Sequence, residues 1–157
     1  MARGFMADGM LGRLCRWMRL LGYDVTYAGS EKEDAEILRE CESRGLFLLT
    51  RDRELSRRYR ESMYLESDDW RRQLAQVMAA FPPERSAMFT RCPLCNSSLV
   101  AVGNGEVSSL VPDGVLERHD RFYRCTGCGK VYWEGSHFRN IKGEIDRLRG
   151  TDEDHRQ

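Results

Sequence analysis

The sequence predicts an α/β protein: a parallel sheet with flanking helices, followed by a small second domain rich in cysteine. Three observations predict this class. Residues 3–81 alternate between strand-like and helix-like patterns, which is typical of a parallel sheet. Residues 46–50, LFLLT, form a continuous apolar run that suits a strand buried on both faces. Two CxxC pairs then occur within residues 92–128, among many Gly and Ser.

The chain opens with a strand, a helix and a second strand. Residues 3–8 form the first strand, which ends at Asp8. A helix follows in residues 10–22, because apolar residues recur there at helical spacing and Gly22 ends the pattern. Residues 24–28 are rich in β-forming residues and predict the second strand. The predicted buried face of the helix consists of Leu11, Leu14, Cys15, Met18 and Leu21.

A second helix precedes the apolar strand. Ser30 and Glu33 have the spacing of a capping box, which predicts a helix from about Glu31 to Arg44. Gly45 closes this helix as a C-terminal glycine. The strand at 46–50 then follows directly.

The last elements of the first domain are a short helix, a strand and a longer helix. The polar segment 51–60 predicts the short helix, and residues 62–66 predict the fourth strand. Residues 68–81 form the longer helix, which Pro82 and Pro83 end. Its apolar residues at helical spacing are Trp70, Leu74, Val77, Met78 and Phe81.

The domain boundary is predicted near residues 82–90, where the composition changes. We expect a first domain over residues 1–83, a second over 84–150, and a flexible tail over 151–157. Within the second domain, short β-like pieces precede a charged helix over residues 138–149.

Composition excludes some classes of protein. Apolar residues make up 41% and charged residues 32%, as in a globular protein, and the formal net charge is zero. No stretch approaches the roughly 20 apolar residues of a membrane helix. The N-terminus has no secretory apolar region, so we expect a cytoplasmic protein with no membrane partner. The cations are almost all Arg, which suits phosphate contacts and equally suits a GC-rich genome.

The two CxxC pairs are the most specific motif. Cys92 with Cys95 and Cys125 with Cys128 can clasp one tetrahedral ion, which predicts a closed structural zinc site without zinc catalysis. An insertion around residues 107–117 explains the long spacing between the pairs. A redox interpretation needs only one CxxC pair beside a helix, so two matched pairs favour zinc. Cys15 and Cys41 lie on apolar helix faces and are expected in the core.

Three aspartates are candidates for a second metal site. Asp8 and Asp52 each follow a predicted buried strand, and the carboxyl ends of parallel strands share one edge. Asp34, near the start of a helix, can face the same edge. Together they predict a site for Mg²⁺ or Mn²⁺. Each alone has a structural alternative, since Asp8 and Asp52 can cap helices and Asp34 can be an exposed acid of a first turn.

Arginines surround these acids in the sequence. Arg51 and Arg53 flank Asp52, while Arg13, Arg16 and Arg19 follow the first helix. Cations beside a carboxylate cluster suit a polyanionic substrate bridged by metal. Arg57, Arg58 and Arg60 fit a solvated helix face better.

With these residues in place, the chain resembles the Mut-seven C-terminal RNase family. The resemblance rests on MLGRLCRWMRLLGYD, EDAEIL, LLTRDREL, RCPLCNSSL and FYRCTGCGKVYWEGSH in that order. It implies a PIN-like domain with an attached zinc ribbon and a metal-dependent ribonuclease activity. It also implies that Asp8, Asp34 and Asp52 hold the catalytic cation and that RNA is the partner. A fourth acid has no secure position, because Asp68 and Asp69 also fit a helix cap.

Two other functions remain open at this point. The first is an RNA-binding zinc-ribbon protein without catalysis. The second is a phosphate-transfer protein with a single strand-end Asp. A phosphatase of this kind usually has a second Asp two residues later, where this chain has Met10. A receiver domain has a Lys near a late strand, and no Lys lies between Lys32 and Lys130 here. The sequence does not reveal whether the chain has a protein partner.

Overall fold

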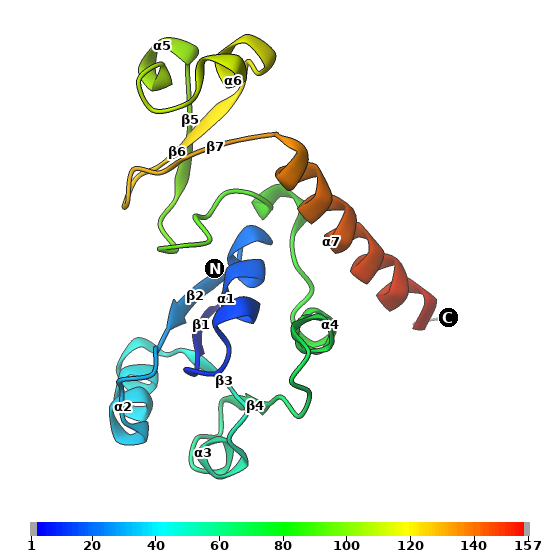
Figure 1. Cartoon of the computed structure of the whole chain (residues 1–157). Coiled ribbons are helices and arrows are strands. Elements are labelled where there is room, and N and C mark those ends of the chain that lie inside the picture. Colours follow the sequence, from blue (N-terminus) through cyan, green and yellow to red (C-terminus); the bar gives the residue numbers. More distant parts are fainter. Residues whose placement is uncertain (1–2, 156–157) are drawn as a thin grey trace. The chain divides into compact units, whose positions relative to one another are not determined.

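Four short parallel strands build the first sheet, in the order β2-β1-β3-β4 (Figure 1). The computed structural model describes residues 3–155 and divides into two compact units, residues 1–96 and residues 97–157. The sheet belongs to the first unit. Its strands are β1 (Gly4–Ala7), β2 (Asp24–Tyr27), β3 (Phe47–Thr50) and β4 (Ser62–Tyr64).

The two central strands are buried on both faces. Met6 of β1 pairs with Leu48 of β3, and Ala7 pairs with Leu49. Leu48, Leu49 and Thr50 are all 0% exposed. The prediction of a doubly covered parallel strand from LFLLT is therefore confirmed.

Four helices cover this sheet: α1 (Gly12–Leu20), α2 (Asp34–Arg44), α3 (Arg53–Arg57) and α4 (Trp70–Ala80). On one face Met6 and Leu48 pack with Ile37 and Cys41 of α2 and with Leu55 of α3. The predicted apolar face of α1 is buried throughout.

Aromatic rings tie α1 and α4 to the sheet and to each other. Trp17 of α1 stacks on Trp70 of α4, with ring centroids 4.3 Å apart. Phe81, directly after α4, meets Phe5 and Phe47 edge-on at 5.0 and 4.8 Å. The apolar ends of β1 and β3 are thereby covered by the end of α4.

The start of α2 differs from the prediction. The helix begins at Asp34 after Glu33 as N-cap, with no side-chain cap, so the capping box at Ser30 is wrong. Gly29 adopts a φ of 73°, which sends residues 29–31 into a turn instead of a helix. The predicted C-terminal stop is confirmed, because Gly45 ends α2 in the left-handed conformation.

The second unit is a three-stranded antiparallel sheet with two short helices. The strands are β5 (Leu99–Val102), β6 (Phe122–Cys125) and β7 (Val131–Trp133), in the order β5-β6-β7. The helices are α5 (Asn104–Val107), which ends where the expected insertion at 107–117 begins, and α6 (Asp113–Arg118), which overlaps it. Val107, Val111 and Phe122 form the core of this unit, and Trp133 packs against it.

A final helix, α7 (Ser136–His155), is longer than the predicted 138–149. The flexible tail over 151–157 stays a prediction, and residues 156 and 157 lie outside the described part of the chain. A short 3-10 helix, Arg85–Ala87, follows α4 in the first unit. Within residues 3–155, we find no helix with the length and apolar character needed to span a membrane.

Candidate active site and metal centre

Hydrogen bonds of its backbone and of its side chain hold Asp8 at the end of β1. Its backbone N–H donates to the Leu49 carbonyl at 3.0 Å, which continues the pairing of β1 with β3. Its Oδ1 accepts from the Gly9 N–H at 2.7 Å, and its Oδ2 accepts from the Thr50 hydroxyl at 2.8 Å. The half-buried carboxylate therefore has a fixed orientation.

Gly9 lets the turn after β1 pack closely on the turn after β2. A Cβ at Gly9 would lie 2.5 Å from the Gly29 carbonyl oxygen, closer than any side chain allows. The Tyr27 hydroxyl also donates to the Gly9 carbonyl at 2.6 Å. The backbone that carries Asp8 is therefore held against the neighbouring strand end.

Asp52 caps α3. Its Oδ1 accepts from the N–H groups of Glu54 and Leu55, at 3.0 and 3.2 Å. Its Oδ2 accepts no hydrogen bond from any residue that the structure describes. The capping interpretation is thus confirmed, while the role of this exposed residue as a metal ligand stays a prediction.

Thr50 connects the two aspartates. Its hydroxyl donates to Asp8 Oδ2 and accepts from the Asp52 N–H at 2.9 Å, and the residue is 0% exposed. Sequence reasoning did not single it out. The signal was present, since Thr50 is a hydroxyl residue between a buried apolar strand and an acid.

The strand order places this pair at a topological switch point. From β1 the chain moves to β2 on one side, then to β3 on the other side of β1. Asp8 follows β1 and Asp52 follows β3, so both lie at the point between these strands where the direction of winding reverses. Ligands of open parallel sheets bind at this position.

The third predicted acid stands apart from this linked pair. Asp34 is the first residue of α2 and is exposed. No hydrogen bond joins it to Asp8 or Asp52 within the described residues. Its membership of a metal site remains a prediction.

Asp69, by contrast, has the structural role of a helix cap, which was one of the two alternatives left open by the sequence. Its Oδ1 accepts from the Arg71 N–H at 3.1 Å and caps α4, and Ser67 Oγ accepts from the Asp69 N–H at 3.0 Å. Asp68 beside it is exposed.

Two of the predicted arginines lie at the same edge of the sheet as Asp52. Arg51 is half-buried and donates from Nη2 to the Glu66 carbonyl at 3.1 Å. Arg53 is exposed, with its guanidinium 4.9 Å from the centre of the Tyr64 ring. Both guanidinium groups are close to Asp52 along the chain.

The three arginines of α1 differ from one another. Arg13 and Arg16 are exposed, and the Arg13 guanidinium lies 5.3 Å from the Trp70 ring centre. Arg19 is only 7% exposed and its Nε donates to the Val25 carbonyl at 3.0 Å. A guanidinium buried in this way serves the fold, so we remove Arg19 from the proposed phosphate contacts.

Arg19 also holds the first cysteine knuckle. This knuckle is the turn at residues 92–95, and Pro93 and Leu94 lie between its two cysteines. The Arg19 Nη1 donates to the Pro93 carbonyl at 3.0 Å and to the Leu94 carbonyl at 3.2 Å. Asn96 adds two hydrogen bonds with β2. Its Nδ2 donates to the Asp24 carboxylate, and its Oδ1 accepts from the Val25 N–H.

The four cysteines of the two CxxC pairs form a group that can hold a metal ion. Their sulfur atoms all lie within 4.8 Å of one another, and Cys92 and Cys125 are buried. Cys125 Sγ accepts from the N–H groups of Gly127 and Cys128, at 3.3 and 3.4 Å. A set of four thiolates is compatible with zinc.

The remaining cysteines are core residues, as predicted. Burial raises the pKa of the Cys15 and Cys41 thiols to about 11, so both stay protonated at neutral pH. Among the side chains that the structure describes, the four-cysteine cluster is the one group of three or more His, Cys, Asp or Glu placed to hold a metal. Asp8, Asp34 and Asp52 do not form such a group.

Comparison with known proteins agrees with these features. The family model described as the Mut7-C RNAse domain matches residues 3–145. This match covers the first sheet, both CxxC pairs and the start of α7. Neither the curated proteins nor the solved structures gave a match.

Proposed function

Because the chain belongs to the Mut7-C RNase domain family, we propose that it hydrolyses RNA phosphodiester bonds with Mg²⁺ or Mn²⁺ at the carboxyl edge of its PIN-like first sheet. One observation carries this proposal. Asp8 and Asp52 flank the switch point of the sheet and share the buried Thr50 hydroxyl. A carboxylate with a supported orientation at a ligand crevice is the arrangement that a metal-dependent nuclease needs.

The donor atoms suit a hard divalent cation. Each oxygen of Asp8 accepts one hydrogen bond and keeps a second lone pair, and Oδ2 of Asp52 accepts none from the described residues. Mg²⁺ is usually bound through one or two carboxylates together with waters and substrate phosphates. Asp8 and Asp52 therefore supply an adequate donor set, and we propose Asp34 as the third acid.

Different residues have different roles in the proposed reaction. Asp8 and Asp52 would hold the cation, which supplies Lewis acidity at the phosphodiester and acidifies a water molecule. Thr50 fixes the Asp8 carboxylate, so little reorganisation accompanies substrate binding. Arg13, Arg16, Arg51 and Arg53 would neutralise neighbouring phosphates and position the strand without reading its sequence.

We propose that the four cysteines hold a structural zinc ion and that the unit with β5 to β7 is a zinc ribbon that aids RNA binding. Four thiolates would occupy all four coordination positions of a tetrahedral zinc ion, so no position would remain open for catalysis. The proposed role is to stabilise this part of the chain and to present it to RNA.

The test is RNA cleavage in Mn²⁺ by the parent protein and by Asp52→Asn. Asparagine keeps the oxygen that caps α3 but removes the negative charge, so folding should persist while cleavage falls. We expect a loss of at least about a hundredfold, because even the outer partners of metal ligands cost about 10- to 100-fold. Thermal unfolding of both proteins checks the fold.

Glu54→Gln is the matched control, since it removes the same charge from an exposed acid of α3 that pairs with Arg57. It should cleave at the parent rate. If Asp52→Asn cleaves as fast as the parent at saturating Mn²⁺, Asp52 is only a cap and the proposed site is wrong. If the parent binds RNA but never cleaves it, the chain is a non-catalytic RNA-binding protein instead.

A further inference from the structure

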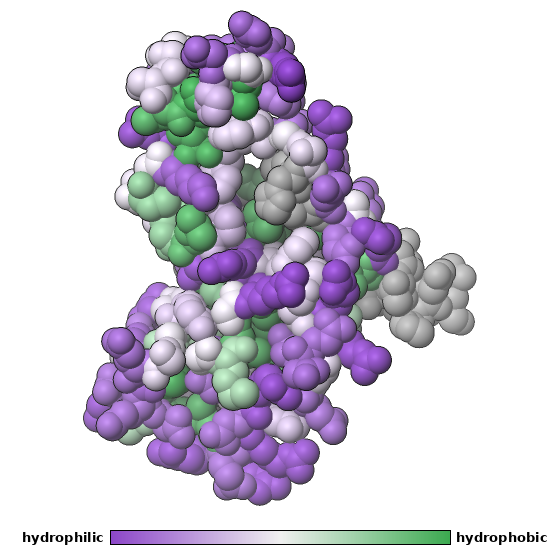
Figure 2. Space-filling model, viewed as in Figure 1, coloured by the Kyte–Doolittle hydropathy of each residue, from purple (hydrophilic) through white to green (hydrophobic). Residues whose placement is uncertain are grey.

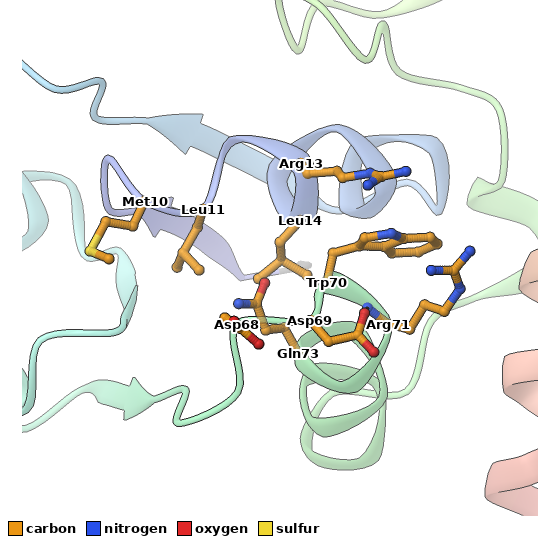
Figure 3. Close-up of a pocket in the computed structure, with 9 residues that line it drawn as sticks. All are labelled: Met10, Leu11, Arg13, Leu14, Asp68, Asp69, Trp70, Arg71 and Gln73. Carbon is orange, nitrogen blue, oxygen red and sulfur yellow. The ribbon is translucent and has the colours of Figure 1, made fainter.

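A pocket lies beside the proposed active site, between the start of α1 and the start of α4 (Figure 3). It has a volume of about 230 Å³. Leu11 and Leu14 give it apolar walls, and Trp70 and Gln73 line it from α4. The Leu11 N–H donates to the Asp8 carbonyl at 2.9 Å, so the pocket wall is one turn away from the Asp8 carboxylate.

Gln73 turns an acceptor toward this pocket. The residue is 4% exposed, and its Nε2 donates to the Ser67 carbonyl at 2.7 Å. Because a carbonyl oxygen only accepts, the amide nitrogen must face Ser67 and Oε1 must face the opposite way. Figure 3 shows this oxygen directed toward Leu14. No residue in the described part of the chain donates a hydrogen bond to it.

Trp70 adds a buried donor to the lining. It is 5% exposed, and its indole Nε1 is buried without an acceptor among the described residues. Its ring is held by the stacked Trp17 and by the Arg71 guanidinium, 4.5 Å from the ring centre. Buried polar groups normally have partners, and among the described residues the indole Nε1 is the buried unpartnered atom of this lining. The Gln73 oxygen has no donor among them either and remains accessible, so it can accept a hydrogen bond from a ligand in the pocket.

We propose that this pocket binds the base of an unpaired RNA nucleotide next to the cleavage site, an inference that rests on the proposed ribonuclease function. Every RNA base carries an N–H donor on its pairing edge that can meet Gln73 Oε1. The flat apolar faces of a base suit Leu11 and Leu14. At 230 Å³ the pocket is smaller than the roughly 300 Å³ at which drug-sized sites begin, so it suits one base.

The charges at the pocket favour a base over a phosphate group inside it. Asp68 and Asp69 line the pocket together with Arg13 and Arg71, so the charges of the lining balance and supply no net positive charge for a phosphate inside it. Arg13, which is exposed at the same pocket, can neutralise the phosphate that remains outside. A paired base has its edge occupied, so the pocket selects single-stranded RNA.

Affinity measurements with the full chain test the proposal. Fluorescence anisotropy would follow a short unstructured RNA, alone and annealed to its complement, without added divalent cation. The parent should bind the single strand at least about tenfold more tightly than the duplex. Gln73→Leu removes the acceptor and should weaken single-strand binding about tenfold, with duplex affinity unchanged.

Gln76→Leu is the matched control, because Gln76 is exposed on the same helix and does not line the pocket. It should bind the single strand like the parent. Equal affinity of the parent for both RNAs would overturn the proposal, as would an unchanged affinity of a folded Gln73→Leu. The ribonuclease proposal survives either result if the parent still cleaves RNA in Mn²⁺.

A second measurement uses only the parent fold and covers the case in which Gln73→Leu unfolds. Cytidine and ribose 5-phosphate would be titrated separately while NMR follows the indole N–H of Trp70, assigned with Trp70→Phe. Cytidine should shift this resonance and ribose 5-phosphate should not. The opposite pattern would identify a phosphate site and refute the base pocket.

Discussion

Thr50 shows how one hydroxyl can organise two acids that are far apart in the sequence. It is the last residue of β3 and is fully buried, yet it donates to Asp8 and accepts from the Asp52 backbone. It touches neither the proposed cation nor the substrate, so its proposed role is to position Asp8. The outer partners of metal ligands in other proteins have this role.

Replacement of Thr50 separates this positioning role from a purely structural one. Thr50→Val keeps the shape but leaves Asp8 Oδ2 without its donor, so cleavage in Mn²⁺ should fall about 10- to 100-fold. Thr50→Ser retains the hydroxyl and should restore most of the activity. The apparent affinity for Mn²⁺, taken from the dependence of rate on its concentration, should weaken for Val and not for Ser. An unchanged Mn²⁺ dependence in a folded Thr50→Val would mean that the hydroxyl only supports the fold.

At the scale of elements, the first cysteine knuckle is joined to α1 and β2. Arg19 donates to the Val25 carbonyl and to both residues between Cys92 and Cys95, and Asn96 bonds to β2. The knuckle is therefore anchored within the first unit by side chains that the metal does not contact. This role of Arg19 could not be predicted from the sequence, because Arg13, Arg16 and Arg19 are the same residue type at neighbouring positions on one helix.

Arg19 and Arg16 of α1 should consequently differ in their response to the same substitution. Arg19→Met removes three hydrogen bonds, one buried and two partly buried, and should lower the free energy of unfolding by about 2–4 kcal/mol. Arg16→Met changes an exposed residue and should stay within about 0.5 kcal/mol of the parent. Urea unfolding followed by circular dichroism measures both. Equal stabilities of the two variants would show that the Arg19 anchor contributes nothing.

The elements with clear patterns were predictable from the sequence. The buried face of α1 and the doubly covered β3 follow from hydrophobic periodicity, which depends only on local order. The start of α2 was not predictable in this way, because Gly29 adopts a left-handed turn that overrides the capping-box pattern of Ser30. The residues FYRC of strand β6 show little alternation, and their strand structure depends on pairing with β5 and β7.

The candidate site was predictable only in part for a similar reason. The positions of Asp8 and Asp52 at strand ends follow from local pattern and sheet geometry. The link through Thr50 depends on the register of β1 with β3, which pairs Met6 with Leu48 and sets Thr50 beside Asp8. The Gln73 and Trp70 pair needs the packing of α4 on α1, and no local pattern encodes that contact.

At the scale of the whole molecule, a formal net charge of zero means that RNA binding must depend on local charge. The surface over α2 and α3 is largely hydrophilic (Figure 2), and α3 carries Arg53 and Arg57 in its five residues. These two arginines differ in their surroundings. Arg57 pairs with Glu54 at 2.8 Å, whereas Arg53 lies over Tyr64 with no carboxylate paired to it among the described residues.

This difference sets the expected salt dependence of RNA affinity. Each phosphate that the protein neutralises on a single strand contributes about −0.7 to the slope of log K against log salt. If Arg13, Arg16, Arg51 and Arg53 each meet one phosphate, the parent slope should be about −3. Arg53→Gln should make the slope shallower by about 0.7, because one contact is lost, and should weaken binding at low salt. Arg57→Gln should leave the slope unchanged, since Glu54 already neutralises that cation.

Anisotropy titrations of a single-stranded RNA at several salt concentrations, without divalent cation, measure all three proteins. A slope near zero for the parent, or equal slopes for the two variants, would mean that the arginines around Asp52 do not contact the RNA backbone.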